Sequence, residues 1–88
     1  MEFVSLIRFR RKLSKADVDR TDSIIRENPQ VRVRTLLWTF GRYDGILVAE
    51  APDEKTYMKF ILQFGDYLST ETLVGVPRDE ALKIAGLR

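Results

Sequence analysis

The order of strand-type and helix-type segments constrains the fold of this chain more than any other feature of its sequence. Residues 3–10, 31–40 and 68–76 have the alternation or the β-branched and aromatic content of strands. Asp44-Gly45 is a strong turn signal, so residues 46–50 are expected to return beside residues 31–40 as the second strand of a hairpin. One hairpin and two longer connections therefore join four strands.

Helix-type segments fill the two longer connections. A helix is expected over residues 15–27, which follow Ser14, a residue type that caps helices. Asn-Pro at residues 28–29 ends this helix. A second helix opens at residues 52–54 and is expected to stop at Gly65, with an acidic first turn that suits the helix dipole. Its apolar side chains recur at helical spacing and make it the principal core helix: Tyr57, Phe60, Ile61 and Phe64.

A short closing helix begins at Pro77 and ends at Gly86. The resulting order, βαββαβ plus a short helix, is that of an α+β fold: a ferredoxin-like sandwich with a four-stranded sheet and helices on one face. With 88 residues, we expect residues 1–88 to form one domain with a modest core.

The chain contains no Cys and no His, which removes several classes of chemistry. Disulfide scaffolds, thiol catalysis and Cys-type zinc sites are excluded, and the commonest general base and metal ligand are missing. We therefore predict no cofactor and no metal site. The N-terminus lacks the pattern of a signal peptide and no apolar run approaches about 20 residues, which favours a cytoplasmic protein.

The first strand carries apolar side chains on both faces, with Phe3 and Ile7 on one and Val4 and Leu6 on the other. Helices cover only one face of such a sheet, so the other requires a further layer. We therefore predict a homo-oligomer, at least a dimer, that pairs through the helix-free face. The expected interface residues are Val4, Leu6, Leu36, Trp38 and Leu47.

Two stretches of sequence, residues 38–45 (WTFGRYDG) and residues 50–53 (EAPD), resemble the GYD-domain family, as does TETL at residues 70–73. This resemblance implies a dimeric α/β barrel, in which two ferredoxin-like sheets pack face to face. It also implies membership of a group of small bacterial and archaeal proteins, mostly without an assigned activity. Residues 10–30 do not clearly match the family pattern, so no contact from that region is carried over.

The hairpin end holds the candidate binding residues Trp38, Phe40, Arg42, Tyr43 and Asp44. The hydroxyl and carboxylate of the GYD motif would converge on a ligand, although the same residues also suit a turn with no further role. The two aromatics of this set would line a cavity between paired sheets or fill a packed dimer core.

A set of basic residues offers a second possible site: Arg8, Arg10, Arg11, Lys12, Arg32 and Arg34. Phosphate contact is one reading, but the net charge is only +2 and no aromatic stacking pattern accompanies the set. We therefore expect a solvated or salt-bridged surface and predict no nucleic-acid partner and no membrane partner.

Three functions remain open on the sequence. The first, which we prefer, is an oligomeric module that binds a small apolar or anionic ligand between paired sheets without turnover. The second is a cofactor-free enzyme in which Tyr43 and Asp44 carry out acid–base chemistry. The third is a structural or interaction module with no cavity.

Overall fold

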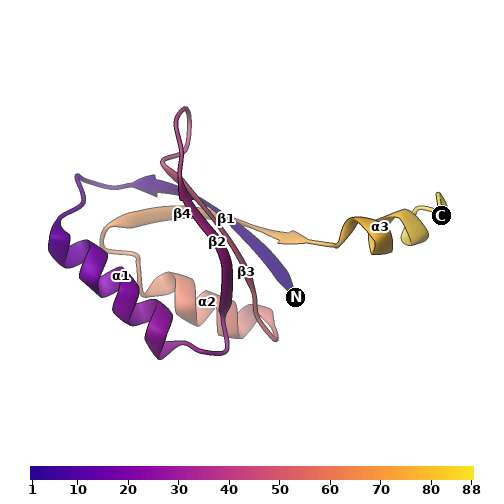
Figure 1. Cartoon of the computed structure of the whole chain (residues 1–88), viewed down its shortest axis with the longest axis horizontal. Coiled ribbons are helices and arrows are strands. Elements are labelled where there is room, and N and C mark those ends of the chain that lie inside the picture. Colours follow the sequence, from indigo (N-terminus) through magenta and orange to yellow (C-terminus); the bar gives the residue numbers. More distant parts are fainter.

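A computed structural model describes all 88 residues of the chain, and Figure 1 shows its elements in space. They are β1 (Glu2–Phe9), α1 (Lys15–Glu27), β2 (Arg32–Trp38), β3 (Gly45–Glu50), α2 (Glu54–Leu62), β4 (Leu68–Gly75) and α3 (Arg78–Ile84). The strands form one antiparallel sheet in the order β2-β3-β1-β4, with α1 and α2 on the same face (Figure 1). The predicted α+β, ferredoxin-like fold is confirmed.

The hydrophobic core lies between this face of the sheet and the two helices. The Phe3 and Tyr57 rings stack with their centroids 4.3 Å apart, and the Phe60 and Phe64 rings pack edge to face at 5.1 Å. These contacts join β1 to α2 and continue into the turn that follows α2. The buried apolar side chains are Phe3, Ile7, Ile24, Val31, Leu47, Ala49, Ala51, Tyr57, Phe60, Phe64 and Tyr67.

Side-chain caps fix where α1 and α2 begin. Ser14 Oγ accepts the Asp17 N–H at 3.2 Å, while the Asp17 carboxylate accepts the Ser14 N–H at 2.9 Å, a capping box. Asp53 Oδ1 accepts the Thr56 N–H at 2.8 Å and caps α2. The second helix ends at Leu62, three residues before the expected Gly65, because the chain there passes into tight turns.

The placement of Leu36, Trp38 and Leu47 on the helix-free face is wrong, for two reasons. A bulge in β2 lets Val33 pair with Ala49 and Thr35 pair with Val48. The side chains that follow the bulge therefore point to the opposite face from the one that strict alternation predicts. Leu36 consequently pairs with Leu47, which is only 3% exposed in the core, and Trp38 pairs with Gly45. The alternation assumed from sequence also put Leu47 on the wrong side of β3.

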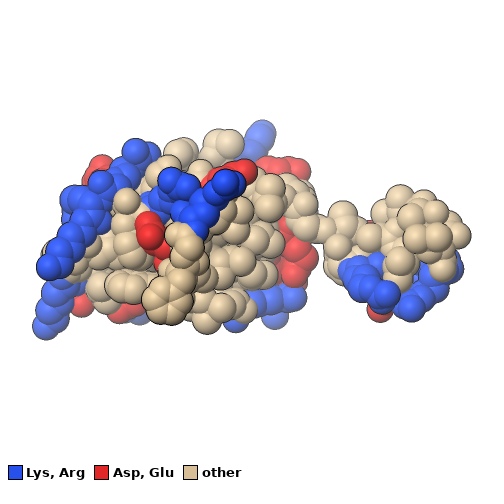
Figure 2. All heavy atoms as spheres, turned by 90° about the horizontal axis from the view of Figure 1, so that it is seen from above, with Lys and Arg blue, Asp and Glu red and all other residues tan.

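The helix-free face still carries an apolar surface, which we call the open band. Val4 and Leu6 of β1 are half-buried there, and their partners across the sheet are aliphatic or charged. Figure 2 views this face and shows uncharged atoms over most of its middle. By register, the open band consists of Val4, Leu6, Leu37, Ile46, Val48 and Leu73.

The last helix, α3, stands apart from the sheet and from the other helices (Figure 1). It contains no buried residue. None of the helices has the length and apolar character needed to cross a membrane.

Candidate functional site

Backbone and side-chain bonds of Asp44 fasten the β2–β3 hairpin to β1. The Asp44 carboxylate accepts the Phe9 N–H at 2.8 Å, and the Asp44 N–H donates to the Ile7 carbonyl at 2.8 Å. The Asp44 carbonyl accepts the Thr39 N–H at 2.9 Å, which closes the loop. Asp44 therefore holds the adjacent side chain, Tyr43, at a fixed place beside the sheet.

Tyr43 is the centre of a polar group that we call the Tyr43 cluster, formed by Arg8, Tyr43 and Glu71. The Tyr43 hydroxyl donates to Glu71 Oε2 at 2.8 Å, and the Arg8 guanidinium carbon lies 5.5 Å from the centroid of the tyrosine ring. The hydrogen bond to Glu71 raises the pKa of Tyr43, so the phenol remains protonated at neutral pH. The cluster joins β1, the hairpin and β4.

Register places the Tyr43 cluster at one end of the open band. Arg8 follows Leu6 by two residues on β1, and Glu71 pairs directly with Leu6 across β1 and β4. A cation, a phenol and a carboxylate therefore border an apolar surface on the helix-free side of the sheet. Such a border can orient a ligand whose body is apolar and whose end is polar.

A second charged group borders the other end of the open band. Arg34 bridges Glu2, at 2.9 Å, and Glu50, with which it makes a close ion pair. A groove of about 470 Å³ runs from these residues to Gly75 and Glu80, near the start of α3. No group of three or more carboxylates comes together here or elsewhere as metal ligands would.

Comparison with a family model decides the classification of the chain. The GYD domain model matches residues 10–85, which include the hairpin, both covering helices and α3. The chain belongs to the GYD domain family. The resemblance seen at the hairpin is thus confirmed.

One solved structure supports the fold of this GYD domain. It is described as "Crystal structure of PH0061" and superposes with a TM-score of 0.55 at 19% sequence identity. The match covers 89% of this chain and 54% of that one, so the GYD domain spans about half the length of PH0061. At this identity the likeness concerns the fold alone. No curated protein matches the sequence.

The five candidate binding residues do not form one group in the GYD domain. Trp38 lies on the helix side of the sheet, where its ring meets Phe9 edge to face at 5.1 Å. Phe40 is fully exposed at the hairpin tip, and Arg42 forms no salt bridge. Of the five, Tyr43 alone belongs to the polar border of the open band, and Asp44 holds Tyr43 in place from the turn.

Sequence reasoning did not assign Arg8 and Glu71 to this site. Both carried a usable signal: Arg8 alternates with Leu6, and Glu71 belongs to the TETL segment that matches the family. What the sequence does not contain is the pairing of β1 with β4 that brings them together. Their shared neighbour, Tyr43, lies 28 residues from Glu71 along the chain.

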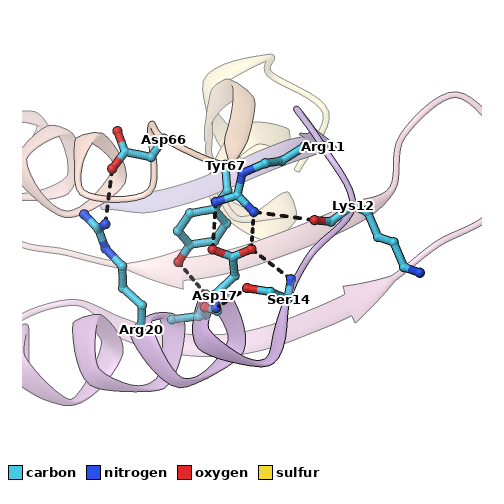
Figure 3. A network of polar contacts seen from close by, with 8 residues as sticks. Arg11, Lys12, Ser14, Asp17, Arg20, Asp66 and Tyr67 are labelled. Carbon is cyan, nitrogen blue, oxygen red and sulfur yellow. Dashed lines mark hydrogen bonds and ion pairs between the residues drawn. The ribbon is translucent and has the colours of Figure 1, made fainter.

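A separate polar network of the GYD domain lies at the start of α1 (Figure 3). The Arg11 guanidinium donates to both carboxylate oxygens of Asp17, one of them at 2.9 Å, and lies 5.8 Å from the Tyr67 ring centroid. The Tyr67 hydroxyl and Thr21 Oγ1 are 2.6 Å apart. This network is saturated with partners and fixes the β1–α1 connection, so it leaves no free group for a ligand.

Proposed function

We propose that this GYD domain forms a homo-oligomer, at least a dimer, which binds a small apolar or anionic molecule between the open faces of two paired sheets. The observation that carries the proposal is the open band: six aliphatic side chains on the face of the sheet opposite α1 and α2. An apolar surface of this kind on a small domain is typical of an interaction site.

A second copy is the cover that suits the open band best. Sheets pack face to face at about 10 Å separation, and a two-fold axis brings the same patch of each copy together. The charged groups at the two ends of the band then lie at the rim of the interface, where they keep contact with water. Aliphatic side chains of both copies line the space between the sheets.

The Tyr43 cluster supplies the polar contacts for a ligand. Arg8 forms no salt bridge with an acidic side chain, so its positive charge is free to meet an anionic group. The Tyr43 hydroxyl donates its single proton to Glu71 and so holds that carboxylate at the border, while the neighbouring aliphatic side chains suit an apolar tail. An apolar carboxylate combines both features.

The enzyme alternative has less support from the same geometry. A general base at Asp44 would have to reach a substrate, but Asp44 Oδ2 accepts the Phe9 N–H and fastens this side chain within the turn, which favours a structural role. Tyr43 has a raised pKa and so serves as a donor and not as a base at neutral pH. Binding without turnover requires neither group to change its protonation state.

Thermal-shift screening against a metabolite library that includes apolar carboxylates tests the proposal. A compound at about 100 times its Kd stabilises the folded protein by about 2.7 kcal/mol. Arg8→Gln and Tyr43→Phe should reduce the shift, whereas Arg26→Gln on α1 is the matched control and should not. The proposal fails if no compound shifts the midpoint, or if the two site variants respond as the control does.

A further inference from the structure

The C-terminal arm, residues 76–88, stands away from the sheet and the other helices, and only its first residues border the body of the domain, where Val76, Pro77 and Glu80 line one wall of the charged groove. The arm leaves the end of β4 and carries α3 away from the sheet, joined to the body by a narrow neck (Figures 1 and 2). Ile84 and Leu87 are 76% and 75% exposed, and Val76 is exposed as well. Several exposed aliphatic side chains gathered on one short segment form a patch of the kind that marks an association surface.

Local interactions nevertheless specify α3 as a helix. Asp79 and Glu80 lie in its first turn, where their negative charges interact favourably with the helix dipole. At its end the Leu87 N–H donates to the Leu82 carbonyl at 2.8 Å, and Gly86 takes the positive φ of 73° that such a termination requires. A helix of this length is still too short to persist in water by itself, so it needs a surface to pack on.

The side chains of α3 divide into two faces. Ala81, Leu82, Ile84 and Ala85 fall on one side of a helix with 3.6 residues per turn, with Arg78 at the N-terminal end of the same side. Asp79, Glu80 and Lys83 fall on the other side. We call the first set the arm stripe. An amphipathic helix of this kind docks by laying its apolar side into an apolar groove.

The body of the same chain offers such a groove between α2 and β4. It has a volume of about 250 Å³ and is lined mainly by apolar side chains, among them Phe3, Tyr57, Met58, Ile61 and Val74. Met58 and Val74 are largely exposed although they border the core. The α2–β4 groove is thus a second apolar surface that lacks a cover.

We propose that the arm of one copy lays its stripe into the α2–β4 groove of a second copy, and that the two copies exchange arms. The chain is self-complementary, because it carries both the unpartnered helix and the unpartnered groove. Reciprocal exchange about a two-fold axis covers both arms and both grooves at once. It is a contact distinct from the pairing of open bands.

The course of the backbone favours a second copy over the arm's own groove. Pro77 has φ −53° and ψ 140°, an extended conformation that continues the direction of β4 instead of reversing it. As a result α3 lies beyond the end of the sheet, away from α2 (Figure 1).

Charge also matches across the proposed contact. Glu54 stands at the edge of the groove, whereas Arg78 and Lys83 of the arm have no acidic partner in the chain. Attraction between them orients the arm on the groove.

Cysteine cross-linking tests this exchange directly, since the natural chain has no cysteine. Met58→Cys and Leu87→Cys are made in separate chains that carry tags of different size, and the two are mixed and oxidised. Both positions are exposed, so neither change disturbs the core. Exchange predicts a disulfide-linked dimer containing one chain of each kind, because a disulfide needs Cβ atoms about 3.5–4.5 Å apart.

Two controls give every outcome a meaning. Asp22→Cys on α1 mixed with Leu87→Cys should give little mixed dimer, and Leu82→Asp in the arm should abolish the Met58–Leu87 product. An equal yield from the Asp22 pair would show random collision and overturn the proposal. A third protein carries Met58→Cys and Leu87→Cys in the same chain. If its disulfide forms only within the chain and never between chains, the arm folds onto its own groove, and the proposal is also overturned. Neither result depends on whether the open bands pair or bind a ligand.

Discussion

At the scale of single residues, one carboxylate holds the start of α1 in several ways. Asp17 pairs with Arg11 and accepts the Ser14 N–H, and the hydrogen bonds from Arg11 are the main cause that holds the pKa of this carboxyl well below its usual range. The unfolded chain keeps an ordinary pKa of about 3.9. Asp17 therefore stabilises the fold above that pH, and its contribution is lost as the pH falls toward the pKa of the folded state.

Substitution of this carboxylate should change the acid-unfolding profile. Asp17→Asn is expected to lower the unfolding midpoint at pH 7, and its difference from the natural protein should shrink steadily below about pH 4. Asp22→Asn, on the exposed side of α1, is the control and should leave the profile unchanged. A difference that is constant from pH 7 to pH 2 would contradict an electrostatic role for Asp17.

Residue-scale prediction from sequence reached its limit at contacts between distant segments. Tyr43 and Asp44 could be placed at a hairpin because turn chemistry is local. The partner of Tyr43, Glu71, depends on β4 pairing beside β1, which no local pattern encodes. The hairpin end was therefore predicted, while the group that Tyr43 forms there was not.

At the scale of elements, the bulge in β2 decides which side chains face the helices. Arg34 is the residue in excess: Val33 pairs with Ala49 and Thr35 with Val48. Alternation read from the sequence kept strict period two through this point and so moved Leu36 to the wrong face. The order of the elements was predictable because capping and turn residues mark their ends, but an extra residue within a strand has no comparable mark.

Deletion of Arg34 should therefore be tolerated. Without it, Val33 and Thr35 become consecutive and every later residue of β2 keeps its present partner. The loss is that of exposed ion pairs with Glu2 and Glu50, worth about 1 kcal/mol or less.

Insertion of one alanine after Leu36 is the matched comparison for this deletion. It moves Trp38 to the opposite face of the sheet and should lower the thermal midpoint much more than the deletion does. Calorimetry of both variants, with tryptophan fluorescence as a second measurement, checks whether the bulge lies at Arg34. Equal destabilisation by the two changes would show that the bulge has been misplaced.

At the scale of the whole molecule, one sheet presents two different apolar faces. The first is covered by α1 and α2, and it contains the core that capping, periodicity and turn signals predicted. The second is the open band, whose existence followed from apolar residues on both sides of β1. The residues that make up the open band could not be predicted from the sequence, because they depend on the register of three strand pairs.

The open band makes a prediction about association that separates it from the aromatic residues of the hairpin. Leu6→Asp places a charge at the centre of β1 on the side away from the core, so it should leave the circular dichroism spectrum unchanged and weaken the proposed dimer. A central interface residue contributes about 2 kcal/mol or more, which corresponds to roughly a thirty-fold increase in Kd. Trp38→Ala should leave the mass in light scattering as it was, because Trp38 lies on the helix side against Phe9. If Trp38→Ala dissociates the protein and Leu6→Asp does not, the copies associate through the hairpin end and not through the open band.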